Sequence, residues 1–171
     1  QEILLVATLY DAFILERDGQ LSQQIFGEYY QLNLSSAPRI TSAYGREDAL
    51  RKLARRPCDL VIVMVGLDVQ TPLEIAAEIK AQRDVPILLF FNNSVALPLC
   101  PPADAPEMKA IDRVFVWNGY SKVFLAMTKY VEDRRNADND TALGMVQVIL
   151  LVEDSVRFYS RYLPLLFVEI M

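Results

Sequence analysis

The fold of this chain is decided by its most apolar stretch, DLVIVMV at Asp59–Val65. Every residue after the first is apolar, as expected for a strand that is buried on both faces of a parallel sheet. Similar apolar runs lie at Ile3–Ala7 and Pro86–Phe91, and two further strand patterns lie at Arg39–Ala43 and Arg113–Trp117. These five segments are the predicted strands.

Amphipathic stretches separate the predicted strands. Arg46–Arg56 has acidic residues in its first turn and basic residues in its last, which suits the helix macrodipole. A second helix is expected to begin with Thr71 as N-cap and Pro72 in the first helical position, and Glu74 would complete a capping box. A third amphipathic helix is expected at Gly119–Arg134.

Two stretches depart from this simple alternation. Leu9–Leu32 is predicted to be a long helical region interrupted at Asp18-Gly19, a strong turn dipeptide. Residues 92–111 contain four prolines, and each proline inside a helix costs about 3 kcal/mol. We therefore predict a loop there, with one helical turn near Glu107–Ile111. The alternation as a whole predicts an α/β fold, a doubly wound five-stranded parallel sheet with helices on both faces.

The composition excludes several classes of function. The formal net charge is −5 and the basic residues are scattered, which disfavours nucleic acid and anionic membrane surfaces as partners. The chain has no histidine, which excludes Ser-His-Asp catalysis, histidine-ligated zinc and a histidine phosphocarrier. Cys58 and Cys100 are too far apart for a zinc site and indicate reduced thiols in a cytoplasmic protein. No apolar run reaches the ~20 residues that a membrane-spanning helix needs.

The C-terminal part of the chain begins a new unit. Residues 135–145 are polar and are interpreted as a linker, and they are followed by a predicted strand at 146–152 and a predicted helix at 155–171. Ile149–Val152 repeats Ile3–Val6 letter for letter. Because this repeat follows a complete five-strand unit, it predicts a domain that starts again.

With these elements in place, residues 1–134 resemble the receiver domain of response regulators, and residues 146–171 resemble the first strand and helix of a second receiver. The resemblance implies a flavodoxin-like sheet with strand order 2-1-3-4-5 and a role in two-component phosphorelay signalling. In that family, two acidic residues after the first strand bind Mg²⁺, and an aspartate that ends the third strand accepts a phosphoryl group from a histidine kinase. A Ser or Thr ends the fourth strand, and a Lys ends the fifth.

The first copy lacks the family's residue type at each of these positions. Ala7 and Thr8 stand in place of the acidic pair, and Met64 stands in place of the phosphoacceptor. Phe91 occupies the Ser/Thr position, and Trp117 occupies the Lys position. The resemblance therefore implies a degenerate receiver, or pseudo-receiver, with neither catalytic residues nor a cofactor. We expect the side chains of Met64, Phe91 and Trp117 to converge in one apolar plug at one end of the sheet.

Asp68 is the nearest alternative to Met64 as an acceptor, and capping of the local loop is its other interpretation. In the second copy, Leu151–Ser155 fits the family's acidic-pair motif, so Glu153 and Asp154 are candidate Mg²⁺ ligands. Two adjacent carboxylates alone bind Mg²⁺ poorly, and this site would be complete only in an intact second receiver.

A weaker resemblance links Leu5–Phe13 and Val152–Tyr159 to the N-terminal region of bacterial multidomain signalling proteins that carry a phosphoenolpyruvate-synthase-like part. The leading expectation is a non-catalytic regulatory module that binds another protein or other domains of its own polypeptide. The alternatives are phosphoacceptor function in the second copy, or a small-cofactor domain such as a flavin domain, for which no G-x-G-x-x-G loop is present. The apolar residues after 146 also predict a homodimer formed through the C-terminal segment.

Overall fold

The computed structural model describes residues 1–8, 27, 29–30 and 37–170. It contains a five-stranded parallel sheet in the order β2-β1-β3-β4-β5, which confirms the predicted fold class and strand order. The strands are β1 at Glu2–Ala7, β2 at Arg39–Tyr44, β3 at Leu60–Val65, β4 at Ile87–Phe91 and β5 at Arg113–Val116. The helix predicted at Leu9–Leu32 lies almost entirely outside the described residues.

The central strand β3 divides the core into two layers. All six of its residues are buried, as expected for the most apolar run in the chain. Ile62 and Met64 belong to one apolar cluster, whereas Val61, Val63 and Val65 belong to the other. Successive side chains of a strand point to opposite faces of the sheet, so β3 needs cover on both sides.

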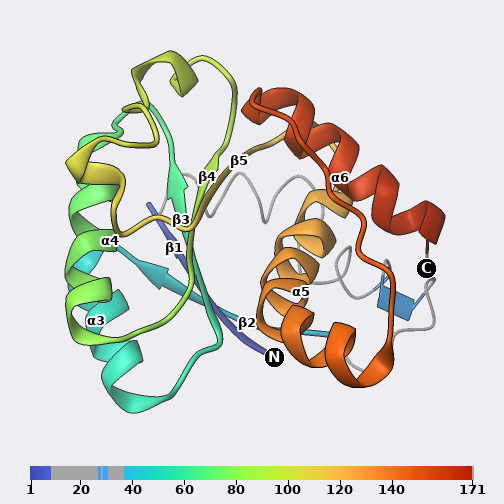
Figure 1. Ribbon diagram of the computed structural model, residues 1–171. Helices are drawn as coiled ribbons and strands as arrows, with labels where there is room; N and C mark the ends of the chain where they lie inside the picture. Colours follow the sequence, from blue (N-terminus) through green and yellow to red (C-terminus); the bar gives the residue numbers. More distant parts are fainter. Residues whose placement is uncertain (9–26, 28, 31–36, 171) are drawn as a thin grey trace.

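Helices in the described part of the chain cover both faces. Helices α3 (Arg46–Arg55) and α4 (Gln70–Gln82) pack on one face of the sheet, and α5 (Lys122–Gly144) and α6 (Val156–Ile170) pack on the other. Figure 1 shows these two layers with the sheet between them. A doubly wound sheet of this kind follows from right-handed crossovers between parallel strands.

Helix α3 forms where the charge pattern predicts it. Asp48 in its first turn accepts a hydrogen bond from the backbone N–H of Tyr44 at 3.0 Å and one from Lys52 Nζ at 2.8 Å. These bonds, led by the one from Lys52, lower the pKa of Asp48 to about 2. Lys52 also donates to the carbonyl of Ser42 on β2 at 2.6 Å, which ties the helix to the edge strand.

The predicted start of α4 at Thr71 is wrong. The helix begins at Gln70, and the Thr71 side chain forms no capping box with Glu74. Asp68 Oδ1 instead accepts hydrogen bonds from the backbone N–H groups of Gln70 at 2.9 Å and Thr71 at 3.4 Å. Asp68 therefore satisfies the free amides of the first turn.

The proline-rich stretch between β4 and β5 is a loop, as predicted. It contains two single-turn 3₁₀ helices, η1 at Leu97–Leu99 and η2 at Pro106–Met108. Met108 and Ala110 are buried against the α3–α4 side of the core. This loop stands where the alternation would otherwise place a helix.

The C-terminal part differs from its prediction in two ways. Helix α5 continues to Gly144, past the expected end at Arg134, so nearly all of the segment interpreted as a linker is helical. The helix ends at Met145, which has a left-handed φ of 49°. Its last turns are exposed and contain no proline, so polar composition alone did not indicate where the helix stops.

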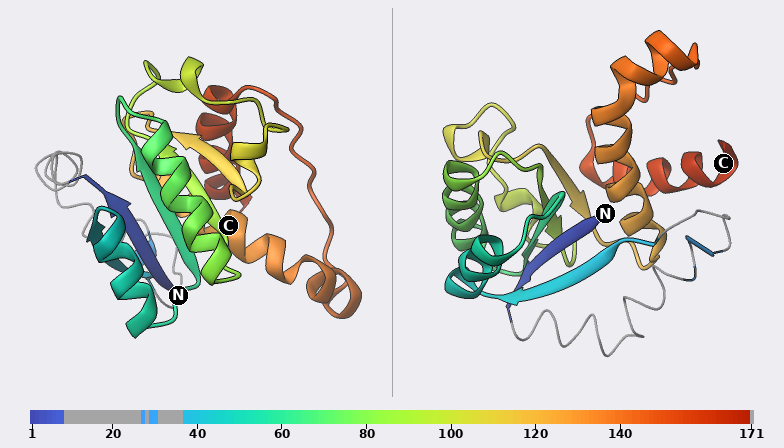
Figure 2. Two further views of the ribbon diagram at one scale, coloured as in Figure 1. Left: turned by 90° about the vertical axis from the view of Figure 1, so that its left-hand side faces the viewer. Right: turned by 90° about the horizontal axis from the view of Figure 1, so that it is seen from below.

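The strand predicted at 146–152 does not form. Residues 145–155 run as an extended connection that pairs with none of the described strands, while α6 forms as predicted (Figure 2). A strand needs a neighbour for its backbone groups, and α6 covers the free edge of β5, where Val116 N–H donates to Ser160 Oγ at 3.0 Å. The division into residues 1–134, 135–145 and 146–171 stays a prediction.

Candidate functional site at the carboxyl end of the sheet

The candidate site lies where the strands end, since ligands of open α/β sheets bind outside the carboxyl ends of the strands. Backbone hydrogen bonds align the residues that come after neighbouring strands. Asn92 N–H donates to Val65 O at 3.1 Å, and Trp117 N–H donates to Phe91 O at 2.8 Å. The four positions singled out from the sequence therefore lie along one edge of the molecule.

At the end of β1, Ala7 is buried and Thr8 is exposed. The Ala7 carbonyl accepts a hydrogen bond from Gly45 N–H at 3.2 Å, which joins this strand end to the start of α3. Neither side chain has a carboxylate, which is the ligand that Mg²⁺ prefers in such sites. These two side chains therefore supply no carboxylate ligand for a divalent cation.

The end of β3 is closed by an aromatic cluster. Met64 is 3% exposed and lies in register with Phe90 on β4. The ring of Phe90 lies 6.2 Å from that of Trp117 and 5.0 Å from that of Phe124 on α5, measured between centroids. These four side chains share one apolar cluster, which we call the aromatic plug.

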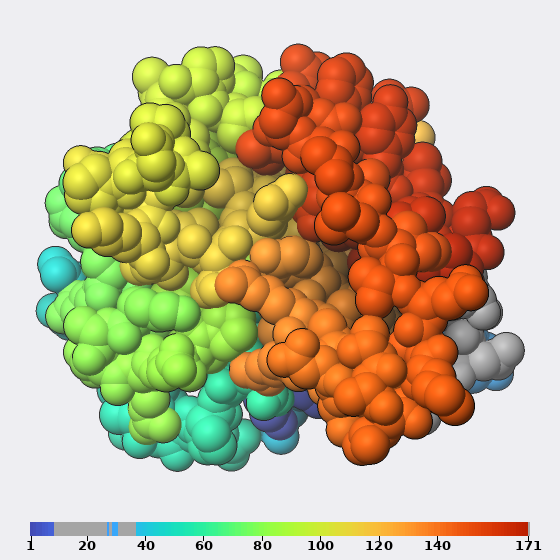
Figure 3. Space-filling view, viewed as in Figure 1, coloured from blue at the N-terminus to red at the C-terminus, as the bar shows by residue number. Residues whose placement is uncertain are grey.

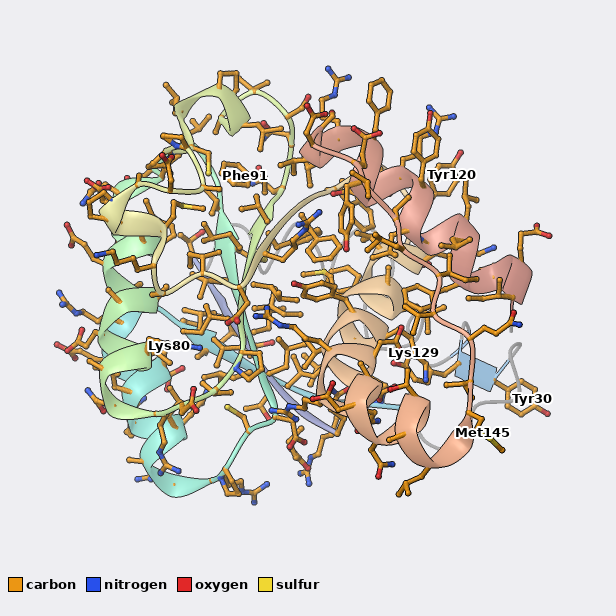
Figure 4. All side chains as sticks on the ribbon, viewed as in Figure 1. Tyr30, Lys80, Phe91, Tyr120, Lys129 and Met145 are labelled. Atoms are coloured by element: carbon orange, nitrogen blue, oxygen red, sulfur yellow. The ribbon has the colours of Figure 1, made fainter. Side chains whose placement is uncertain are left out.

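Phe91 does not belong to the aromatic plug, so the prediction of one patch that contains Met64, Phe91 and Trp117 is wrong. Phe91 lies in register with Val65, one residue beyond Met64, and its side chain packs in the cluster on the α3–α4 face. Figure 4 shows it beneath the loop that carries η1. Phe90 occupies the position beside Met64 that was predicted for Phe91. Adjacent residues of a strand face opposite sides of the sheet, so only one of the two can lie there.

Asparagine side chains at this edge were missed in the sequence. Asn93 Nδ2 donates to Asn92 Oδ1 at 2.6 Å, and Asn93 Oδ1 accepts from Val95 N–H at 2.8 Å. Asn118 donates to the carbonyl of Ser160 at 3.0 Å. Asn residues directly after apolar strands are a recognisable turn signal, and here they shape the loops after β4 and β5.

Asp68 is the acidic residue nearest in sequence to the end of β3, and its carboxylate serves the next helix. Hydrogen bonds from Thr71, and further ones from backbone amides, lower the pKa of this exposed carboxyl group. Its geometry is that of a loop cap, which was one of the two interpretations of this residue.

Glu153 and Asp154 lie at the amino end of α6. Glu153 Oε1 accepts a hydrogen bond from Ser155 N–H at 2.9 Å, and Ser155 Oγ accepts one from Phe158 N–H at 3.4 Å. Acidic groups are favourable at a helix amino end because they oppose the macrodipole. In the part of the chain that the structure describes, no three Cys, Asp or Glu side chains are placed to hold a metal ion together.

Two pockets of the described residues lie away from this edge of the sheet. One of about 230 Å³ lies between β1 and α3 at the amino end of the sheet, and one of about 420 Å³ lies between α4 and η2. Cys58 lines the first pocket, and burial raises the pKa of its thiol, so it stays protonated and is a poor nucleophile. Within the described ranges, no helix has the length and hydropathy that crossing a bilayer requires.

Comparison with known proteins places the fold. No family model matches the sequence, and no curated protein matches it. Solved structures do match. One is the N-terminal domain of a response regulator/sensory box/GGDEF three-domain protein from Carboxydothermus hydrogenoformans, with 14% identity, a TM-score of 0.55, and coverage of 81% of this chain and 99% of that chain.

Two further structures agree with the first. The response regulator TrrA from Thermotoga maritima, in complex with Mg(2+)-BeF, has 21% identity and a TM-score of 0.53 and covers 77% of this chain and 98% of its own. The signal receiver domain of an HD domain-containing protein from Pseudomonas fluorescens has 23% identity and a TM-score of 0.52, with coverage of 81% and 91%. The chain therefore has the CheY-like, flavodoxin-like fold of response-regulator receiver domains.

Proposed function

We propose that this chain is a degenerate receiver module of a two-component signalling protein, which acts by protein contact and does not accept a phosphoryl group on its first copy. The observation that carries the proposal is the aromatic plug. Met64, Phe90 and Trp117 fill the carboxyl edge of the sheet with hydrocarbon and sulfur. A receiver of the conventional kind has carboxylates and an amine there.

The chemistry of phosphoryl transfer explains why the plug matters. The reaction needs a nucleophilic oxygen, a divalent cation held by carboxylates, and a positive charge for the phosphoryl oxygens. The Met64 thioether cannot become a stable phosphoryl acceptor, and Ala7 cannot bind a cation. Replacing buried charged groups by well-packed apolar ones is often neutral or stabilising, so the fold survives the loss of the site.

The proposed partners follow those of the structurally similar proteins. TrrA is also known in complex with the histidine kinase ThkA, and the Carboxydothermus structure is one domain of a three-domain protein. We assign this chain the same kind of partner, a cytoplasmic signalling protein or other domains of its own polypeptide. The C-terminal segment is proposed as the part that contacts a second chain, and the protein is proposed not to be an enzyme.

A second candidate function rests on the acidic pair of the C-terminal segment. Glu153 and Asp154 come after the repeated Ile-Leu-Leu-Val run, at the position where a receiver holds Mg²⁺. If residues 146–171 begin a second receiver, conventional phosphoacceptor chemistry would belong to that copy. The first copy would then be an unphosphorylated domain beside a second copy that is phosphorylated.

Acetyl phosphate labelling with Mg²⁺ tests the proposal. Intact mass measurement should show no phosphoryl adduct on the wild-type chain, while a conventional receiver treated in parallel should be labelled. Asp68→Asn and Asp59→Asn serve as paired variants, because both carboxylates lie close to β3 in sequence. A stable adduct on the wild type that disappears in Asp68→Asn would contradict the proposal.

Trp117 provides a second readout, since it is the only tryptophan in the chain and belongs to the aromatic plug. Addition of Mg²⁺ with beryllofluoride should leave its fluorescence unchanged. A saturable change would show that the edge binds a phosphoryl mimic, and the proposal would fail.

A further inference from the structure

Helix α6 has two apolar stripes, and only one of them is covered. The inner stripe consists of Tyr159, Leu163 and Phe167, which are 6–7% exposed. The outer stripe consists of Phe158, Tyr162 and Leu165, which are 52%, 46% and 52% exposed. Residues spaced by three and four positions lie on one face of a helix, so each set forms a continuous surface.

The inner contacts fix the direction in which the outer stripe points. Ser160 Oγ accepts a hydrogen bond from Val116 N–H at 3.0 Å, and Ser160 O accepts one from Asn118 at 3.0 Å. The guanidinium of Arg113 lies 3.9 Å from the centroid of the Tyr159 ring, within the range of a cation–π contact. Since α6 is held through this side, the outer stripe must face away from the sheet.

Two aromatic rings of the outer stripe stack on each other. The rings of Phe158 and Tyr162 stack at 5.8 Å with an interplanar angle of 11°. The extended connection before the helix adds exposed apolar residues, including Val148, Leu150 and Val152 at 72%, 81% and 83%. In the space-filling view this connection and α6 together form much of one side of the molecule (Figure 3). Exposed apolar side chains grouped on one helix face, as in the outer stripe, mark an interaction site.

The charges on α6 indicate which partner fits. Arg157 and Arg161 are exposed beside the outer stripe, and Glu169 continues the stripe toward the end of the helix. A second α6 placed antiparallel brings the arginines of one copy toward Glu169 of the other. A parallel arrangement would bring arginine against arginine. Like charges at close range are unfavourable, so the helix is complementary to itself in only one of these directions.

We propose that the outer stripe of α6 is the contact surface for a second copy of this chain, with two α6 helices packed antiparallel about a two-fold axis near Tyr162 and Leu165. This inference rests on the proposed contact function and names the partner and the surface. The two stripes of α6 then have separate roles, because the inner stripe holds the helix on its own domain and the outer stripe holds the other chain.

Sedimentation of the 171-residue chain over a range of concentrations tests the interface. The wild type should be a dimer, and Leu165→Asp should weaken association by about tenfold or more because a charge then lies at the centre of the contact. Leu67→Asp is the matched control, since Leu67 is 79% exposed and lies in the loop between β3 and α4. Circular dichroism should show that both variants keep the fold.

Charge reversal tests the direction of packing. Arg161→Glu should weaken the dimer, and the double variant Arg161→Glu with Glu169→Arg should restore it. A wild type that stays monomeric at every concentration overturns the inference. A dimer that survives Leu165→Asp and is lost with Ile149→Asp also overturns it, because the connection would then be the interface. The phosphoryl labelling experiment does not depend on any of these results. The proposed α6 dimer can therefore be contradicted without contradicting the proposal that the first copy accepts no phosphoryl group, and the reverse also holds.

Discussion

The chain contains the run Ile-Leu-Leu-Val twice, and the two copies have opposite fates. At Ile3–Val6 the run is part of β1, and its side chains are 2–3% exposed between β2 and β3. At Ile149–Val152 the same letters lie in an extended connection without a strand partner, and Leu150 and Val152 are more than four-fifths exposed. The same four letters therefore give a core strand in one place and a largely exposed connection, in which only Leu151 packs against the core, in the other.

The difference teaches that strand formation here depends on neighbours. A strand leaves its backbone N–H and C=O groups to be satisfied by adjacent strands, whereas a helix satisfies most of its own. β1 finds a partner on each side. The second run lies between a long helix and α6, which already occupies the free edge of β5.

The largest expected difference is between truncations of the equivalent leucine in the two runs. Leu4→Ala removes a side chain that is 3% exposed, and the lost burial and the remaining cavity should lower the free energy of unfolding by about 2–5 kcal/mol. Leu150→Ala, its counterpart in the second run, should change it by no more than about 0.5 kcal/mol. Urea denaturation of both variants measures the difference. Equal losses would show that the second run is also buried.

A smaller effect is expected where α6 closes the sheet. Ser160→Ala removes the acceptor of the Val116 N–H and leaves a buried donor unpaired, which should cost about 1–3 kcal/mol. Hydrogen exchange at the Val116 amide should accelerate, whereas amides in the middle of β3 should keep their protection. Ser94→Ala, at an exposed serine, is the control. Unchanged exchange at Val116 would mean that α6 does not seal this edge.

A third prediction concerns the buried hydrogen bond between Tyr29 and Thr128. The Tyr29 hydroxyl donates to Thr128 Oγ1, which in turn donates to the carbonyl of Leu125 at 2.8 Å. Burial is the main cause that raises the pKa of Tyr29 to about 12, with the hydrogen bond to Thr128 acting in the opposite direction. Because the folded state disfavours the tyrosinate, stability that is present below pH 10 should decline as the pH rises from about 10 to 12.

Tyr29→Phe tests this pH dependence. The variant should lose about 1 kcal/mol at neutral pH, since Thr128 keeps a backbone acceptor, and it should lose less than the wild type between pH 10 and 12. Tyr30→Phe, at a side chain that is 78% exposed, should leave the profile unchanged. Chemical denaturation at stepped pH gives both curves. Identical alkaline slopes in Tyr29→Phe and the wild type would assign the decline to other groups.

The predicted parts of the fold are those that local patterns determine. Apolar runs located β1, β3 and β4, and weaker patterns located β2 and β5, each within one residue at either end. The prolines between β4 and β5 correctly excluded an α-helix. The end of α5 was missed because a polar, solvated helix and a polar linker have similar compositions. Thr71 and Asp68 are both good caps by residue type, and only the backbone path decides that Asp68 meets the free amides.

The candidate site shows a different limit. Its chemical character was visible in the sequence, because the residue types at the strand ends are apolar. Which residues form the site was not visible in the sequence. The choice between Phe90 and Phe91 depends on the register between β3 and β4, and this register links residues far apart in the chain. A shift of one residue moves a side chain to the other face of the sheet.

The smallest effect concerns the residue pairs at the carboxyl ends of the two runs. Ala7 and Thr8 come directly after the first run, and Glu153 and Asp154 come directly after the second. Glu153 accepts a hydrogen bond from Ser155 N–H and opposes the dipole of α6, so Glu153→Gln, which keeps an acceptor oxygen and removes the charge, should destabilise the first turn by about 0.3–1 kcal/mol. Amide exchange in that turn of α6 provides the measurement. Asp154→Asn removes the other negative charge at this helix end and should act in the same direction, and Asp104→Asn, at an exposed carboxylate in the loop between β4 and β5, is the control. If millimolar Mg²⁺ instead slowed exchange in the wild type and in neither Glu153→Gln nor Asp154→Asn, the two carboxylates after the second run would be acting as cation ligands in this chain.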